Sequence, residues 1–156
     1  MDGHSDTLTY QLIIGTGMVV GTVVFHIVGL IALARAASAL HLGDADRSWW
    51  RPTWVLVTVV IALIIIHSAE AWGWAVLFMV LGEFDTLEAS LYFSASTATT
   101  LGYGDITLSN RWRLLGTFEA MGGWILFGAS AAFLFEIVRD SVGRVIRSTT
   151  SGESNP

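Results

Sequence analysis

The stretch that decides the fold is Thr99–Asp105, with the sequence TTLGYGD. It lies between a short apolar segment and a long apolar segment, and it places two glycines where a helix would otherwise begin. Glycine is the residue that adopts left-handed backbone angles without steric cost. Gly102 and Gly104 are two positions apart, so they predict an extended segment in which alternate residues take angles that a side chain would disfavour.

The segment before it, residues 87–98, is predicted to form a short helix. Thr86 or Asp85 would cap this helix, and Glu88 would lie in its first turn. About twelve residues are too few to cross a bilayer, yet the segment is too apolar for a solvated loop. We therefore expect a re-entrant helix buried in protein, whose carboxyl end points at the middle of the bilayer. The partial negative charge at that end favours a cation.

The rest of the chain is apolar enough to lie in a membrane. Of its 156 residues 53% are hydrophobic and 13% are charged, and the mean hydropathy is +0.62. Too few polar side chains remain to cover a soluble core. Three apolar segments, Leu12–Ala34, Thr53–Gly82 and Leu114–Val138, reach the roughly 20 residues that cross a bilayer. The sequence predicts an all-α membrane protein with three transmembrane helices. It contains no cysteine, so a disulfide and a thiolate metal site are both excluded.

The arginines predict the orientation of the spans. Six of the eight basic residues flank the ends that would share one side of the membrane: Arg35, Arg47, Arg51, Arg139, Arg144 and Arg147. Only Arg111 and Arg113 lie on the other side. The positive-inside rule then places the carboxyl terminus in the cytoplasm and the amino terminus outside a plasma or inner cell membrane. We expect the tryptophans to form aromatic belts at the two interfaces, among them Trp49, Trp50, Trp54, Trp72, Trp74 and Trp112.

The TTLGYGD stretch carries the chemistry of ion selection. A potassium ion sheds its water only where protein oxygens replace the hydration shell, and rings of backbone carbonyls from four loops can do this. The hydroxyl of Thr100 would add a further ring of oxygens at the inner end. Coming after a short helix and before a membrane span, this string is a specific signal.

The segment Glu88–Asp105, EASLYFSASTATTLGYGD, resembles the pore loop of the potassium-channel superfamily. With its flanking helices the resemblance covers about Thr53–Val138. It implies a homotetramer with a re-entrant pore helix and a selectivity filter in each subunit, in which K⁺ is the permeant ion. The implied ion-binding filter is Thr100, Leu101, Gly102, Tyr103 and Gly104, with K⁺ bound at the first four of these.

Span lengths, the arginine distribution and the resemblance together predict a division of the chain. Residues 1–10 would be an extracellular tail, 11–35 a peripheral transmembrane helix, 36–52 a cytoplasmic loop, 53–139 the pore domain and 140–156 a cytoplasmic tail. The pore domain would comprise an outer helix at 53–82, a pore helix at 87–98, a filter at 99–105 and an inner helix at 112–139. The small-residue pattern Gly17–Gly21 predicts that the peripheral helix packs on the outer helix.

The chain departs from the family pattern at two positions around the filter. Leu101 stands where valine or isoleucine is usual, and Ser96 stands where some members keep a glutamate that pairs with the filter aspartate. Asp105 therefore needs another partner, and Tyr92 is the predicted one. In the inner helix the resemblance implies a gating hinge at Gly128. Close packing against the pore helix is expected for three other glycines: Gly116, Gly122 and Gly123.

Polar residues inside the spans predict a buried cluster behind the filter. His67 and Glu70 are three residues apart and share a helix face, and Glu119 lies at a similar depth in the third span. A structural hydrogen-bond network, a proton-sensitive element and a metal site are all compatible with this set. His26 in the first span is expected to be a neutral imidazole that hydrogen-bonds to a neighbouring helix.

The sequence as a whole favours a potassium-selective channel that conducts passively, modulated by pH through the His/Glu layer. A non-conducting pore-like sensor or interaction protein, and a weakly selective cation channel, are the alternatives. We expect no enzymatic activity, no cofactor and no nucleic-acid partner. The expected partners are further copies of the chain, membrane lipid and K⁺.

Overall fold

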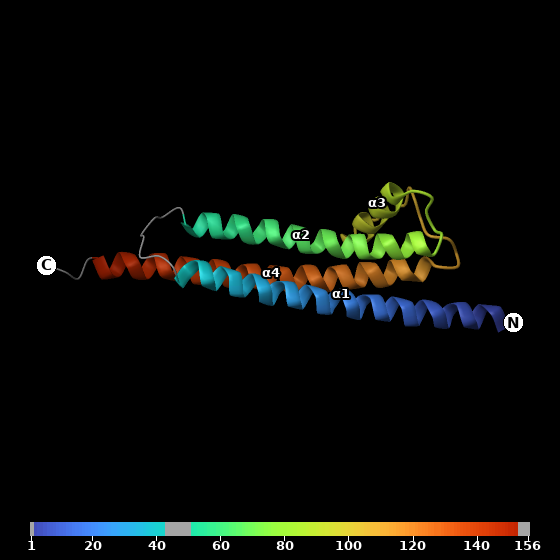
Figure 1. The fold of residues 1–156 in the computed structure, drawn as a ribbon, viewed down its shortest axis with the longest axis horizontal. Coiled ribbons are helices and arrows are strands. Elements are labelled where there is room, and N and C mark those ends of the chain that lie inside the picture. Colours follow the sequence, from blue (N-terminus) through green and yellow to red (C-terminus); the bar gives the residue numbers. More distant parts are fainter. Residues whose placement is uncertain (1, 43–50, 153–156) are drawn as a thin grey trace.

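The computed structural model describes residues 2–42 and 51–152, and these ranges form four helices and no strand. The helices are α1 (Asp2–Leu42), α2 (Arg51–Val80), α3 (Leu87–Ala98) and α4 (Arg113–Gly152). Residues 43–50, the part of the predicted cytoplasmic loop with Arg47, Trp49 and Trp50, lie outside the described residues. Figure 1 shows α1, α2 and α4 as long helices side by side, with α3 packed at one end.

Three helices are long and apolar enough to span a membrane, as predicted. The candidate spans are Asp6–Ser38, Thr53–Val80 and Arg113–Asp140. The all-α membrane fold with three spanning helices is thereby confirmed.

Most of the two segments predicted as tails, residues 1–10 and 140–156, is helical. Helix α1 starts at Asp2, and α4 continues to Gly152. Residues 2–10 and 140–152 contain no proline, so the helices continue past the apolar residues. Helix α1 also extends to Leu42, into the predicted loop 36–52, because Ala36–Leu42 consists mainly of alanine and leucine, which are strong helix formers.

Helix α2 ends at Val80, two residues before the predicted end of the outer helix. Gly82 has φ 72°, a left-handed angle. Its amide donates to the carbonyl oxygen of Met79 at 3.0 Å, and the Glu83 amide donates to that of Phe78 at 3.0 Å. These two bonds satisfy carbonyls that the helix end would leave unpaired.

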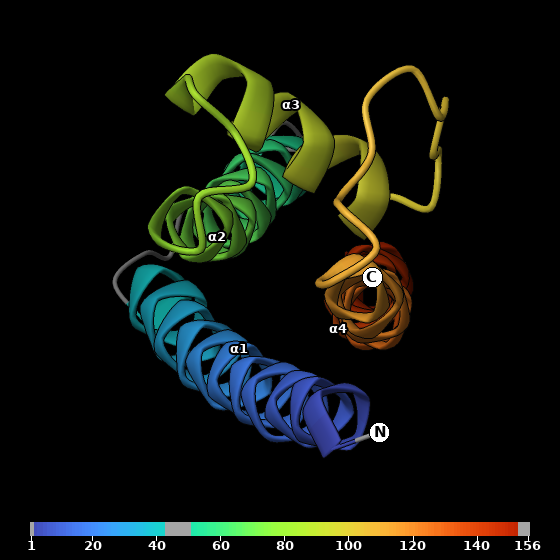
Figure 2. The same cartoon turned by 90° about the vertical axis from the view of Figure 1, so that its right-hand side faces the viewer.

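Helix α1 packs mainly against α4, with fewer contacts to α2. The end-on view in Figure 2 shows α1 on the side of the bundle away from α3, with α2 and α4 between them. The side chain of Gln11 accepts a hydrogen bond from the Leu114 amide at 3.0 Å. A Cβ added to Gly15 would lie 2.5 Å from the ring of Phe118, so the backbone of α1 comes very close to α4 there.

Helix α1 packs on α2 as predicted, but the close approach is not at Gly17 and Gly21. A Cβ added to either glycine would meet no atom within 4 Å. The small residue that allows close approach to α2 is Gly29, where an added Cβ would lie 2.9 Å from Ile66. Gly17 and Gly21 nevertheless face α2, where they line a groove with Ala69, Glu70 and Gly73.

The hydrophobic core lies at the end of the bundle that holds α3. Its buried members are Trp74, Phe78, Phe93, Leu108, Trp112 and Leu115. The rings of Phe78 and Phe93 meet edge to face, with centroids 5.3 Å apart, and tie α2 to α3. The belt interpretation is wrong for Trp74 and Trp112, which fill this core.

Helix α3 has the predicted bounds and the predicted cap. The Thr86 hydroxyl accepts a hydrogen bond from the Ala89 amide at 3.2 Å, and Glu88 lies in the first turn. Two buried serines attach the helix to α2, since Ser90 donates to the Ala75 carbonyl at 2.7 Å and Ser94 to the Ala71 carbonyl at 2.8 Å. Helix α3 therefore runs along α2 from the end of the span towards its middle.

Candidate functional site

The loop after α3 is attached to the last turn of that helix. The amides of Leu101 and Gly102 both donate to the carbonyl oxygen of Ser96, at 2.9 and 3.1 Å. The Thr100 amide donates to the Thr97 carbonyl at 2.9 Å. These three bonds fix where the loop begins and in which direction it leaves the helix.

Every second residue of this loop has a left-handed backbone. The φ angles are 59° at Thr100, 51° at Gly102 and 75° at Gly104. In a regular extended chain successive carbonyls point in opposite directions, and a change of handedness at alternate residues turns them towards one side. The predicted glycine angles at Gly102 and Gly104 are confirmed. The left-handed angle of Thr100 was not predicted.

Thr100 holds a strained conformation. A β-branched residue at positive φ is a rare outlier that costs on the order of 1–3 kcal/mol, and such strain gathers at functional sites. The hydrogen bonds from the next two residues to Ser96 hold the backbone in this shape. The strain at Thr100 therefore marks this loop as a candidate functional site and not a simple turn.

The predicted contact between Tyr92 and Asp105 is present. The Tyr92 hydroxyl donates to Oδ2 of Asp105 at 2.8 Å, from α3 to the far end of the loop. This hydrogen bond to the carboxylate raises the pKa of Tyr92. The Ser96 hydroxyl donates instead to the Phe93 carbonyl at 3.1 Å within its own helix.

A second clamp holds the chain as it returns from the loop to α4. The Glu83 carboxylate accepts hydrogen bonds from the amide of Ser109 at 2.6 Å and from its hydroxyl at 2.8 Å. Sequence reasoning missed this contact, because Glu83 and Ser109 are 26 residues apart. The loop is thus held at both ends, by α3 and by the turn after α2.

Behind the loop, the predicted His/Glu cluster separates into two groups. His67 and Glu70 are joined, with Nδ1 of His67 3.0 Å from Oε2 of Glu70. Glu119 is not hydrogen-bonded to either of them. It meets the hydroxyl of Ser94 on α3 instead. Glu119 and Glu70 lie at a similar depth, but α4 directs the Glu119 side chain towards Ser94 of α3 and not towards Glu70 of α2.

The His67 and Glu70 group includes two residues from other helices. His26 on α1 lies with Nδ1 2.8 Å from Oε1 of Glu70, which confirms that His26 hydrogen-bonds to a neighbouring helix. Ser130 on α4 lies 2.9 Å from Nε2 of His67 and 3.1 Å from Nε2 of His26. Sequence reasoning missed Ser130, since one serine in an apolar span carries no periodic signal.

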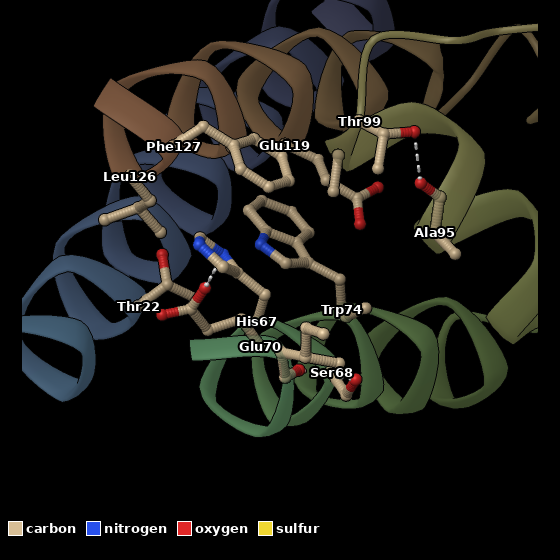
Figure 3. Close-up of a pocket in the computed structure, with 14 residues that line it drawn as sticks. Thr22, His67, Ser68, Glu70, Trp74, Ala95, Thr99, Glu119, Leu126 and Phe127 are labelled. Atoms are coloured by element: carbon tan, nitrogen blue, oxygen red, sulfur yellow. Dashed lines mark hydrogen bonds and ion pairs between the residues drawn. The ribbon is translucent and has the colours of Figure 1, made fainter. Parts of the chain in front are cut away.

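His67, Glu70 and Glu119, from the two groups, line one cavity of about 240 Å³, which also touches Ala98 and Thr99 at the end of α3. Figure 3 shows His67, Glu70 and Glu119 facing this cavity, with the indole ring of Trp74 beside them. Glu119 is only 1% exposed, and its Oε2 has no hydrogen-bond partner among the described residues. The lining of the cavity is therefore mainly apolar, and its ionisable groups are the carboxyl groups of Glu70 and Glu119 and the imidazole of His67.

The glycines of α4 have different surroundings. A Cβ added to Gly123 would overlap the carbonyl oxygen of Ala98, and one added to Gly116 would lie 3.4 Å from Phe93, so both glycines pack against α3 as predicted. Gly122 does not, because an added Cβ would instead meet Val19 of α1 at 3.4 Å. Gly128 has no atom within 4 Å of its added Cβ, and its role as a hinge stays a prediction.

The Ser94 and Glu119 pair gives a matched test of what holds α3 in place. Ser94→Ala is expected to destabilise the protein more than Ser90→Ala, by about 1–3 kcal/mol, because it leaves a buried carboxyl group without its partner. Both serines are fully buried on α3 and donate to an α2 carbonyl, but only Ser94 meets a carboxyl group. Melting temperatures of the two variants in detergent check this. Equal losses would show that the contact with Glu119 adds no stability.

Comparison with known proteins assigns the chain to a family. Residues 53–140, more than half of the chain, match the model of a family described as "Ion channel". No curated protein and no solved structure gives a match. The matched residues comprise the spanning parts of α2 and α4, together with α3 and the loop that follows it. The chain is a multi-pass membrane protein, and it belongs to this ion channel family.

Proposed function

We propose that this ion channel is a potassium-selective homotetramer that conducts K⁺ passively. The observation that carries the proposal is the alternation of left-handed angles at Thr100, Gly102 and Gly104. It turns successive carbonyls to one side, and carbonyl rings of this kind replace the hydration shell of K⁺. In this proposal K⁺ binds at Thr100, Leu101, Gly102 and Tyr103, and each subunit supplies one strand of the filter.

The exposure of the loop in a single chain supports a tetramer. Leu101 is 55% exposed and Tyr103 is 68% exposed, although both follow a helix that is packed in the core. One face of α4 is also apolar and exposed, with Met121, Trp124, Ile125 and Phe135 at helical spacing. Gly128 lies on the same face by its spacing. Further copies of the chain around a central axis would cover both surfaces.

The roles of the elements follow from this assembly. Helix α2 is the outer helix, α3 the pore helix and α4 the inner helix, while α1 lies at the periphery. The negative end of α3 favours a cation below the filter. The arginine distribution places the filter mouth outside, where Asp85 and Glu88 are exposed and would concentrate cations. The nearby Glu83 is engaged with Ser109.

Tyr92 supports the filter in place of the carboxylate pair found in some potassium channels. Its hydroxyl ties the outer end of the filter, at Asp105, to the pore helix. Modulation by pH through His67, Glu70 and Glu119 stays a prediction, and the pH response of the current in Glu119→Gln would test it.

The test of the proposal is ion flux from liposomes that contain the purified protein. Efflux of K⁺ is expected to exceed that of Na⁺ under equal gradients, because four carbonyl rings fit the larger, more easily dehydrated ion. Equal flux of the two ions would indicate a weakly selective cation channel. No flux over a range of voltage and pH would indicate a pore-like protein that does not conduct.

A further inference from the structure

His26, His67, Glu70 and Ser130 form a closed ring of contacts between three helices. Each histidine places Nδ1 against one oxygen of Glu70, at 2.8 Å for His26 and 3.0 Å for His67. Each also places Nε2 against the single hydroxyl of Ser130, at 3.1 and 2.9 Å. His26 is fully buried, Glu70 and Ser130 are each 7% exposed, and the His67 side chain is 17% exposed.

The ring holds one hydrogen fewer than its contacts need. A neutral imidazole carries one N–H, a serine carries one O–H, and a carboxylate carries none. Two histidines and one serine thus supply three hydrogens, whereas the ring has four contacts. One contact is unsatisfied unless a cation, either a proton or a metal ion, enters the ring.

A metal ion on the Glu70 side satisfies the whole ring. It replaces both Nδ1 hydrogens, so each histidine carries its hydrogen on Nε2 and donates it to Ser130. The two lone pairs of the Ser130 hydroxyl accept both bonds. This arrangement is typical of metal-binding histidines, whose second nitrogen donates to an outer acceptor that fixes the ring. We propose that His26, His67 and Glu70 bind a divalent transition-metal ion of the Zn²⁺ type, with Ser130 orienting both imidazoles.

The donor set and its dimensions agree with this ion class. Imidazole nitrogen with carboxylate oxygen suits Zn²⁺ and its neighbours, whereas Mg²⁺ and Ca²⁺ prefer oxygen alone. One ligand atom from each of the three residues lies within 4.8 Å of the others. Bonds of about 2.0–2.2 Å in a tetrahedral site place ligand atoms about 3.3–3.6 Å apart. Each Nδ1 atom, now 2.8 or 3.0 Å from an oxygen of Glu70, would therefore move away from that oxygen by roughly half an ångström.

The cavity supplies access and a second negative charge. It touches both His67 and Glu70 and reaches Thr99 at the end of α3, so an ion can approach from the side of the loop. A divalent ion with one carboxylate leaves a net positive charge, which is costly inside a membrane. Glu119 lines the same cavity and has a carboxyl oxygen without a partner among the described residues. Its carboxylate would balance that charge.

The test is a Zn²⁺ titration of the full-length protein, stripped of metal with a chelator and kept in detergent at neutral pH. Calorimetry is expected to give one tight site per chain, together with a higher melting temperature. His26→Gln and His67→Gln should each abolish this site. Ser130→Ala keeps all three ligands and should weaken binding about 10- to 100-fold. The control is the double variant His4→Gln/His41→Gln, which removes the other two histidines and should bind Zn²⁺ as the parent does.

Three results would overturn the proposal: no stoichiometric binding by the parent protein, binding that survives His26→Gln and His67→Gln, or binding that is lost in the control. If those variants do not fold, Co²⁺ bound to the parent protein replaces them. A tetrahedral Co²⁺ spectrum that Zn²⁺ displaces supports the site, and its absence contradicts it. Neither measurement involves ion conduction, so the site can fail or stand independently of the proposed channel activity.

Discussion

Gly104→Asp is expected to reduce K⁺ flux from liposomes to the background of empty vesicles. Gly104 has φ 75°, and its neighbours in the alternating pattern are Gly102 at 51° and Thr100 at 59°. A side chain at this position is strained by about 1–2 kcal/mol, which favours a backbone flip that turns a carbonyl away from the others. In the proposed tetramer four carboxylates would also crowd one ring of the filter. Both effects remove the arrangement that replaces the hydration shell of K⁺.

The matched control is Gly82→Asp. Gly82 has φ 72°, and neither glycine has an atom within 4 Å of its added Cβ, so the two substitutions introduce the same strain and the same charge. Gly82 lies in the turn after α2, outside the segment Thr99–Asp105. We expect this variant to assemble and to keep K⁺ flux. Loss of flux in both variants would assign the effect to strain in general, and retained flux in Gly104→Asp would contradict the proposed filter.

The fold could be predicted where a local signal decides it. Span lengths follow from runs of apolar residues, and the bounds of α3 follow from the Thr86 cap and the glycines beyond it. The ends of α1 and α4 could not be predicted in the same way. Hydropathy marks where a helix leaves the membrane, whereas the helix itself continues until a residue breaks it, and no proline does so in Asp2–Tyr10 or in Asp140–Gly152.

The site was predictable only where sequence neighbours define it. Tyr92 and Asp105 are thirteen residues apart, on a helix and the loop that leaves it, so local geometry brings them together. His26 and Ser130 are separated by 104 residues, and their contact depends on how α1 and α4 rotate against each other. That rotation is set by close approaches such as Gly15 to Phe118, which no residue pattern reveals in advance.

Gly123 is the position where α4 comes closest to the end of α3. The carbonyl of Ala98 lies where a side chain on Gly123 would have to go. Ala98 is the last residue of α3, and the loop with the alternating angles begins directly after it. The backbone of α3 cannot turn aside as a flexible side chain would. The close packing of these two helices therefore sets the depth at which the loop starts.

Gly123→Ala is expected to destabilise the protein and to lower the selectivity for K⁺ over Na⁺. Overpacking costs about 1–3 kcal/mol, and the better helix propensity of alanine returns at most about 1 kcal/mol. Gly128→Ala makes the same change five residues further along the same helix, where an added Cβ meets no atom of its own chain within 4 Å, so it adds no overpacking against α3 and should keep or raise the melting temperature. Melting temperatures of both variants and the K⁺ to Na⁺ flux ratio of Gly123→Ala check this. Lower stability in Gly128→Ala as well would show that α4 requires glycine for a reason other than its contact with α3. Unchanged stability and selectivity in Gly123→Ala would mean that this contact does not position the loop.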